Sequence, residues 1–239
     1  TSDEHYLTNL TWTPDEKYVL IAEINRGQNH YWLNRYNIST GKKVNTILEE
    51  SNDKWTEPEH DAVFLPNSET DFLWFSEKDG FMNLYLYNVE GDFKKQVTNF
   101  NWVVQKVLGF DKKGRNVFIA GTGEDAREKH TFKVDLRNGK FVKITNEAGT
   151  HNTQLNSNGT YLIDSYSSLS IPTNIDIVST KTLKSKQIHS EKNPLTDYKL
   201  GTTEFLTLKA EDGTNLYGKI TKPANFDSSK KYPVLVYVY

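Results

Sequence analysis

Apolar and polar positions alternate along most of the chain in short runs, and each run ends at a turn-forming residue. Residues 10–14 lead through a polar turn to the β-branched and aromatic run 18–21. The same order recurs at residues 62–66 and 71–75, at 107–110 and 116–119, and at 153–155 and 161–163. Short alternating runs between turns are typical of half-buried β-strands. The pattern therefore predicts four related pairs of strands.

The four copies are regularly spaced. With Pro14, Pro66, Lys112 and Ser157 taken as equivalent, the steps are 52, 46 and 45 residues. Third strands are expected at residues 31–36, 83–87, 131–134 and 174–178, and short fourth strands at 44–48, 95–98, 141–144 and 185–189. Four short strands repeated at this period match the blade of a β-propeller, so we predict an all-β fold with about four four-stranded blades. A β-sandwich is the alternative, although it does not require the same order of turns in every unit.

The pattern changes near residue 196. Residues 204–209 and 216–221, joined by a turn at Asp212-Gly213, predict a hairpin that fits no fifth blade. The apolar run 234–238 predicts a buried strand, which we expect to pair with that hairpin or with a second copy of the chain. We therefore expect a partial propeller over residues 1–195 and the first strands of a second domain over residues 196–239.

Composition excludes several functional classes. The chain has 239 residues and a formal net charge of −2. Its pI is about 6.3, so neither nucleic acid nor an anionic membrane is an expected partner. No apolar stretch approaches the roughly 18 residues of a membrane helix. Cysteine is absent, which excludes disulfides, thiolate metal sites and a cysteine nucleophile.

The C-terminal residues carry the most specific motif. Residues 212–218 (DGTNLYG), 222–227 (KPANFD) and 230–239 (KKYPVLVYVY) resemble the entry to the catalytic domain of the prolyl oligopeptidase family of serine peptidases. Within that family, residues 5–12 (HYLTNLTW) and 55–58 (WTEP) resemble the dipeptidyl peptidase IV group and its bacterial relatives. The resemblance implies a β-propeller followed by an α/β-hydrolase domain. It also implies a serine exopeptidase that releases Xaa-Pro dipeptides from peptide N-termini.

The same resemblance implies that the chain is a fragment of that enzyme. In the family, the Gly-x-Ser-x-Gly nucleophile elbow, the Asp and the His follow later, and this sequence contains no Gly-x-Ser-x-Gly. Tyr239 matches the tyrosine whose hydroxyl helps to form the oxyanion hole. We therefore expect the isolated chain to be inactive, its parent to need no cofactor, and the parent to be periplasmic or secreted in a bacterium. A non-catalytic propeller that binds other molecules is the alternative function.

The loop at residues 55–61 is the second candidate site. By resemblance it faces the active-site cavity, and Trp55 would then line a substrate pocket. Carboxylates and one histidine in this loop could ligate a metal, but no partner pair of histidines accompanies them, so a polar loop is favoured and no metal site is predicted.

Other polar and aromatic residues receive structural interpretations. Glu49 and Glu50 follow a fourth strand and are interpreted as solvated surface. The six histidines are scattered and are interpreted as surface or turn residues. Four tryptophans recur on predicted strands and are expected in the core between blades; they are Trp12, Trp32, Trp74 and Trp102.

Overall fold

The computed structural model describes residues 4–238, and the regular elements in that range are all β-strands. The chain divides into two compact units. The first contains the residues up to 168 together with 173–190, and the second contains 169–172 and the residues from 191 onward. The four repeats that the sequence predicts all lie in the first unit.

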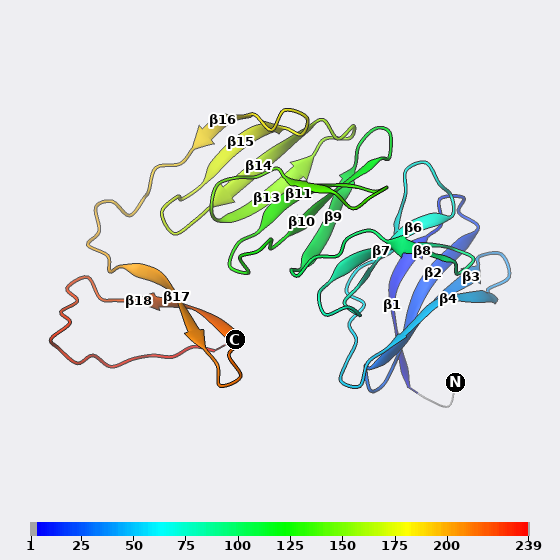
Figure 1. Cartoon of the computed structure of the whole chain (residues 1–239), viewed down its shortest axis with the longest axis horizontal. Helices are drawn as coiled ribbons and strands as arrows, with labels where there is room; N and C mark the ends of the chain where they lie inside the picture. The colour runs from blue at the N-terminus through cyan, green and yellow to red at the C-terminus, as the bar shows by residue number, and fades with distance from the viewer. Residues whose placement is uncertain (1–3, 239) are drawn as a thin grey trace. The chain divides into compact units, whose positions relative to one another are not determined.

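The first unit consists of four four-stranded antiparallel sheets, which we call blades 1 to 4 (Figure 1). Blade 1 contains β1 (His5–Trp12), β2 (Tyr18–Asn25), β3 (His30–Asn37) and β4 (Lys43–Ser51). Blade 2 contains β5 (Val63–Phe64), β6 (Asp71–Ser76), β7 (Asn83–Asn88) and β8 (Phe93–Gln96). Blade 3 contains β9 (Val104–Phe110), β10 (Asn116–Gly121), β11 (His130–Asp135) and β12 (Phe141–Lys143). Blade 4 contains β13 (Thr150–Leu155), β14 (Tyr161–Ser167), β15 (Asn174–Ser179) and β16 (Ser185–Ser190). Each blade is a meander, because its strands pair in the order in which they follow in the sequence.

The same turn closes the first hairpin of blades 3 and 4. A side-chain oxygen of Asp111 in one blade and of Asn156 in the other accepts hydrogen bonds from the backbone N–H groups four and five residues later. Gly114 and Gly159 have φ of +62° and +70°, a conformation that favours glycine. A Cβ on Gly159 would also lie 2.7 Å from the Cα of Asp111. The turn of blade 4 therefore packs directly on the turn of blade 3.

Apolar side chains fill the seams between successive blades. Strand β6 shows why its sequence is almost continuously apolar: Phe72 and Trp74 face blade 1, whereas Leu73 and Phe75 face blade 3. Twelve buried apolar residues form the cluster between blades 1 and 2, 14 form the cluster between blades 2 and 3, and four form the cluster between blades 3 and 4. We call these interfaces seam 1–2, seam 2–3 and seam 3–4.

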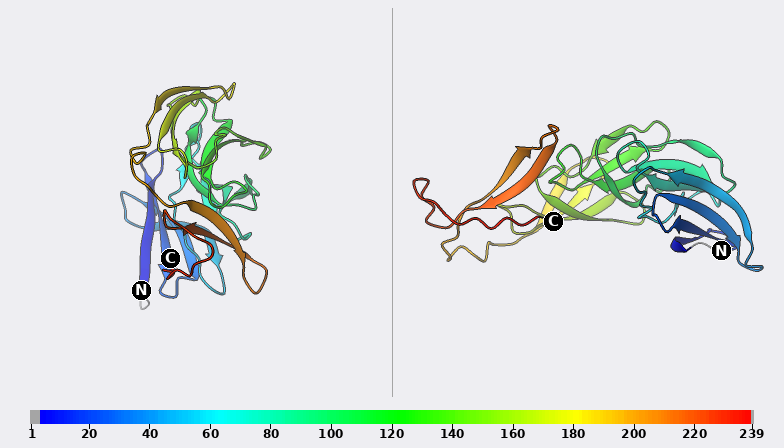
Figure 2. Two further views of the ribbon diagram at one scale, coloured as in Figure 1. Left: turned by 90° about the vertical axis from the view of Figure 1, so that its left-hand side faces the viewer. Right: turned by 90° about the horizontal axis from the view of Figure 1, so that it is seen from below.

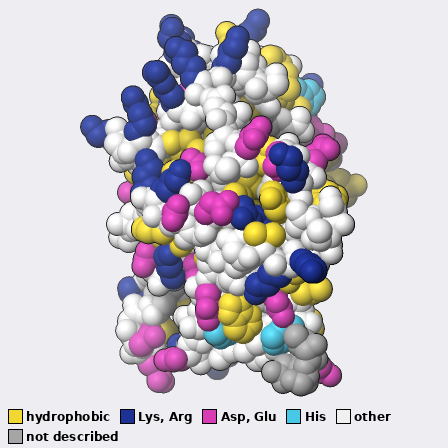
Figure 3. All heavy atoms as spheres, turned by 90° about the vertical axis from the view of Figure 1, so that its right-hand side faces the viewer, with side chains coloured by type: hydrophobic (Ala, Val, Ile, Leu, Met, Phe, Trp, Pro, Cys, Tyr) yellow, Lys and Arg dark blue, Asp and Glu magenta, His cyan; other side chains and the backbone are white. Residues whose placement is uncertain are grey.

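The predicted four-stranded repeat is therefore confirmed, and the sandwich alternative is wrong, because each sheet is a separate meander packed on the next. Trp74 and Trp102 are buried in seams, as expected. Trp12 is 55% exposed, so its predicted core position is wrong; it lies on β1, an edge strand of blade 1. On the face shown in Figure 3, acidic, basic and hydrophobic side chains are mixed over most of the surface.

The second unit contains one hairpin, formed by β17 (Thr203–Lys209) and β18 (Asn215–Thr221) (Figure 2). The predicted hairpin at 204–209 and 216–221 agrees with these bounds. Its turn contains Gly213, whose φ of +85° favours glycine.

The predicted strand at residues 234–238 is not formed. The structure assigns no strand between 231 and 238, and Val234, Leu235, Val236 and Val238 are each at least 75% exposed. The sheet of the second unit consists of β17 and β18 alone within the described residues, so the expected pairing with this hairpin is wrong. The physical reason is that an apolar run becomes a strand only where a neighbouring edge accepts its hydrogen bonds. Pairing with a second copy of the chain stays a prediction.

Candidate functional site

The loop that follows β4 displays Trp55 to solvent. The indole side chain is 57% exposed, whereas the next residue, Thr56, is buried. The backbone N–H of Thr56 donates a hydrogen bond of 2.8 Å to the carbonyl oxygen of Gln28 in the β2–β3 turn. Before Trp55, the backbone N–H of Asn52 donates a hydrogen bond of 2.9 Å to the carbonyl oxygen of Asn29 in the same turn. The loop is therefore anchored on both sides of an exposed aromatic ring.

Carboxylates gather beside this loop. Partial burial raises the pKa of Glu77, and the charges of Glu57, Glu59 and Glu50 raise it further. The ring of His60 packs against Phe75, with ring centroids 4.1 Å apart, and burial lowers the pKa of this histidine. Among residues 4–238, no three His, Asp or Glu side chains are grouped as a metal site would require. The loop thus combines one exposed indole with a negatively charged surrounding.

Glu50 belongs to seam 1–2, which corrects its interpretation as solvated surface. Its side chain is only 14% exposed, and one carboxylate oxygen accepts a hydrogen bond of 2.7 Å from Ser76. The ammonium group of Lys78 lies 3.9 Å from the other oxygen. Burial, followed by the charge of Glu50, raises the pKa of Tyr31 well above its usual range. The Tyr31 hydroxyl also accepts a hydrogen bond of 2.9 Å from Trp74 Nε1. Through Tyr31, the Glu50 carboxylate therefore acts on the buried aromatic core.

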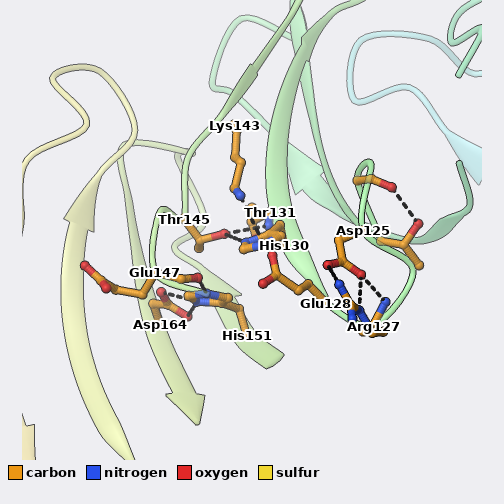
Figure 4. A network of polar contacts seen from close by, with 12 residues as sticks. Asp125, Arg127, Glu128, His130, Thr131, Lys143, Thr145, Glu147, His151 and Asp164 are labelled. Atoms are coloured by element: carbon orange, nitrogen blue, oxygen red, sulfur yellow. Dashed lines mark hydrogen bonds and ion pairs between the residues drawn. The ribbon is translucent and has the colours of Figure 1, made fainter. Parts of the chain in front are cut away.

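Two histidines that were interpreted as surface residues are buried at seam 3–4, which is a second correction. His130 and His151 are each 2% exposed. Their rings lie 4.9 Å apart between centroids, at an interplanar angle of 35° (Figure 4). His130 belongs to β11 and His151 to β13, so the two rings meet across the interface of two blades.

A polar network surrounds these rings. His151 Nδ1 lies 2.8 and 2.9 Å from the two carboxylate oxygens of Asp164, and its Nε2 lies 2.8 Å from the backbone oxygen of Glu147. His130 Nε2 lies 2.7 Å from Glu128 Oε2. The pairing of β13 with β14 brings His151 and Asp164 together. In the β13–β14 register, His151 faces Tyr166 and Thr153 faces Asp164, which makes the pair diagonal neighbours on one face.

Of the two predicted site residues, the structure describes Trp55 alone. Trp55 lies on the loop described above. Tyr239, the predicted oxyanion-hole residue, lies outside the described residues. Residues 4–238 contain no helix long and apolar enough to span a membrane.

Comparison with known proteins identifies the family. The family model described as the dipeptidyl peptidase IV N-terminal region matches residues 1–173. Dipeptidyl peptidase 4 of Arthroderma otae is 27% identical over 216 residues, which cover 85% of this chain and 28% of that protein.

Two solved structures extend the likeness. A Bacteroides ovatus protein assigned as a dipeptidyl aminopeptidase IV is 36% identical, with a TM-score of 0.90 over 98% of this chain and 36% of the other. Dipeptidyl peptidase 4 of Porphyromonas gingivalis is 26% identical, with a TM-score of 0.83 over 96% of this chain and 33% of the other. The chain therefore spans about a third or less of each of these relatives, and it belongs to the dipeptidyl peptidase IV family, whose N-terminal region it matches.

Proposed function

We propose that this chain is the part of a serine dipeptidyl peptidase that contains its later propeller blades and the first strands of its hydrolase domain. The family match over residues 1–173 is the observation that carries the proposal. In the whole enzyme, which would remove Xaa-Pro dipeptides from peptide N-termini, the blades would line and gate the substrate cavity. The propeller would extend over residues 1–195 and the hydrolase domain would begin with residues 196–239. The family resemblance also supports a periplasmic or secreted location.

Trp55 is our proposed substrate contact. An exposed indole on an anchored loop offers a flat apolar surface to a peptide side chain at little cost in conformational entropy. Tyr239 is our proposed oxyanion donor, on the strength of the sequence motif alone. Such a donor typically contributes ~3–4 kcal/mol to transition-state stabilisation.

A binding module without catalysis is the second candidate function. The observation that favours it is that the four blades form one unit, an architecture that does not itself imply catalysis. Both functions predict that the chain by itself does not hydrolyse a Gly-Pro or Ala-Pro chromogenic substrate. Saturable turnover that follows the protein peak through repurification would contradict the assignment of catalysis to residues beyond this chain.

The longer protein that contains this chain separates the two functions. We expect it to hydrolyse Xaa-Pro substrates, and we expect Trp55→Ala to raise KM about tenfold, equivalent to about 1.4 kcal/mol of lost contact. Phe93→Ala is the matched control, because Phe93 is also an exposed aromatic residue. It lies at the start of β8 in blade 2, whereas Trp55 follows the end of β4, the fourth strand of blade 1. No peptidase activity in the longer protein would favour the binding module. Equal effects of the two substitutions would reject Trp55 as a substrate contact.

A further inference from the structure

His130 and His151 lie where blades 3 and 4 are hydrogen-bonded to each other. The backbone N–H of Lys129 donates to the carbonyl oxygen of Gly149 at 3.1 Å, and the N–H of His151 donates to the carbonyl oxygen of Lys129 at 3.0 Å. The hydroxyl groups of Thr131 and Thr153 lie 2.7 Å apart across the same seam. Any change in the His130–His151 contact therefore acts directly on the connection between the blades.

His151 is held as a double donor. Its Nε2 faces the carbonyl oxygen of Glu147, which cannot donate, so Nε2 must carry a proton. Its Nδ1 faces both oxygens of the Asp164 carboxylate, so a second proton must lie between this ring and the carboxylate. The side chains are 1% and 5% exposed, respectively. The simplest description is a buried imidazolium–carboxylate pair, with its positive ring facing His130.

His130 has neighbours that suit a neutral ring. Thr145 Oγ1 accepts the backbone N–H of Thr131 at 3.0 Å and lies 3.0 Å from His130 Nδ1, to which its own proton can be donated. Nε2 then donates to Glu128, 2.7 Å away. The ammonium group of Lys143 lies 3.1 Å from the same nitrogen. A proton added to His130 would therefore face the cationic ring of His151 on one side and Lys143 at its edge.

Burial and two neighbouring cations oppose a proton on His130, and one carboxylate favours it. Burial is the largest cause that lowers the pKa of His130, and Lys143 and His151 lower it further, against Glu128, which raises it. Behind His151, burial and the charge of Asp164 raise the pKa of Asp176, and Glu147 adds to this effect. Asp125 on the β10–β11 loop is engaged by Arg127.

His130 borders a cavity, although the residue is only 2% exposed. A cavity of about 430 Å³ is bounded by Glu128, His130 and Lys143 together with the aromatic rings of Trp102 and Phe141. His130 thus forms part of the wall of this cavity, whereas His151 adjoins a cavity of only about 50 Å³. His130 is accordingly the member of the pair that can exchange a proton with little rearrangement.

We propose that His130 and His151 form a pH-dependent latch between blades 3 and 4, closed while His130 is neutral and loosened when His130 binds a proton. The folded chain disfavours that proton, whereas the unfolded chain binds it at the ordinary pKa of about 6.5. The unfolded or opened state therefore holds more protons as the pH falls below this value. The stabilising contribution of the latch is complete above about pH 6.5 and decreases with acidification.

Hydrogen exchange in the full chain tests the latch. Between pH 7.5 and 5.5, after correction for intrinsic exchange rates, we expect the amides of Lys129 and His151 to lose protection. The loss should be at most about tenfold per pH unit, the limit for one proton. Amides of β6 and β10 at seam 2–3 should keep their protection. Unchanged protection at Lys129 and His151 would overturn the proposal.

Variants identify the titrating group. His130→Asn should abolish the pH dependence of these two amides, and Lys143→Met should reduce it, because removing this charge brings the pKa of His130 closer to its ordinary value. His189→Gln, on the exposed strand β16, is the control and should leave the profile unchanged. If the pH dependence persists in His130→Asn, another group is responsible and the latch is wrong.

Ring nitrogen chemical shifts keep the test decisive even if His130→Asn does not fold. In the unmodified chain at pH 7, His130 should be neutral and His151 should carry protons on both nitrogens. A charged His130 at that pH, or a neutral His151 beside an ionised Asp164, would overturn the proposal.

Discussion

Seams 2–3 and 3–4 join blades of the same architecture by different chemistry. Seam 2–3 contains 14 buried apolar residues, among which Trp102 stacks on Phe100 at 4.0 Å and on Phe132 at 4.6 Å. Seam 3–4 contains four buried apolar residues and, beside them, the His130–His151 network. Two blades can therefore be held together mainly by apolar burial, or by a smaller apolar cluster together with buried charged groups.

The difference has a physical consequence for each seam. Apolar burial stabilises in proportion to the area removed from water and does not depend on pH. A buried charged pair adds little net stability compared with apolar packing, but it is costly to break, because the remaining partner is left buried without compensation. Seam 2–3 should therefore resist changes of solution conditions, whereas seam 3–4 should respond to them.

The largest expected effect is the loss of Trp102. Trp102→Ala should lower the free energy of unfolding by about 3–5 kcal/mol, because it empties the centre of the aromatic stack. Urea denaturation measures this change, and its size should be the same at pH 7.5 and 5.5. Trp12→Ala, at an exposed tryptophan, is the matched control and should change stability by no more than about 0.5 kcal/mol. If Trp102→Ala lowered the free energy of unfolding by less than about 0.5 kcal/mol, the aromatic stack would not stabilise seam 2–3.

A somewhat smaller effect is expected at Asp164. Asp164→Asn should cost roughly 3 kcal/mol, since it leaves His151 without a charged partner in a buried site. Thermal or urea denaturation measures the loss, with Asp53→Asn at an exposed loop position as the control. Equal stabilities of the two variants would mean that the carboxylate does not carry a charge in the folded state.

The smallest effect concerns the hydroxyl pair across seam 3–4. Thr131→Val and Thr153→Val, made singly and together, should reveal a coupling energy of about 1 kcal/mol for this hydrogen bond. The double-mutant cycle isolates that value from the packing change of each substitution. Additive losses would show that the two hydroxyl groups do not cooperate in joining the blades.

The repeat was predictable because its turns are local. An Asp or Asn followed by glycine three residues later fixes the hairpin by side-chain-to-backbone hydrogen bonds, as at Asp111 and Asn156. The alternation of apolar residues then fixes which face of each strand is buried. The strands predicted at 131–134, 153–155 and 161–163 were shorter than β11, β13 and β14, however, and the missing ends contain His130, His151 and Asp164.

The polar network was not predictable from residue types, since glutamate and aspartate usually lie at the surface and histidine shows no strong preference for burial. His151 and Asp164 become neighbours only once the β13–β14 register is known, and His130 joins them only when two blades pack. Glu50 was misinterpreted for the same reason: its burial depends on Ser76 and Lys78 in the next blade. The strand predicted at 234–238 is the opposite error: apolar residues were expected to be buried but are exposed. An apolar run does not itself supply the neighbouring strand edge with which it would have to pair.

The meander within each blade has a consequence for how the chain folds. Since every strand pairs with a neighbour in the sequence, backbone pairing brings together residues that are close along the chain, and little loop-closure entropy is lost. A blade can therefore form as soon as its own 45 or so residues are available, and each new blade finds the previous one as a template. We expect folding to advance blade by blade along the chain during synthesis, with the packed glycine turns of blades 3 and 4 setting the register in which blade 4 is added.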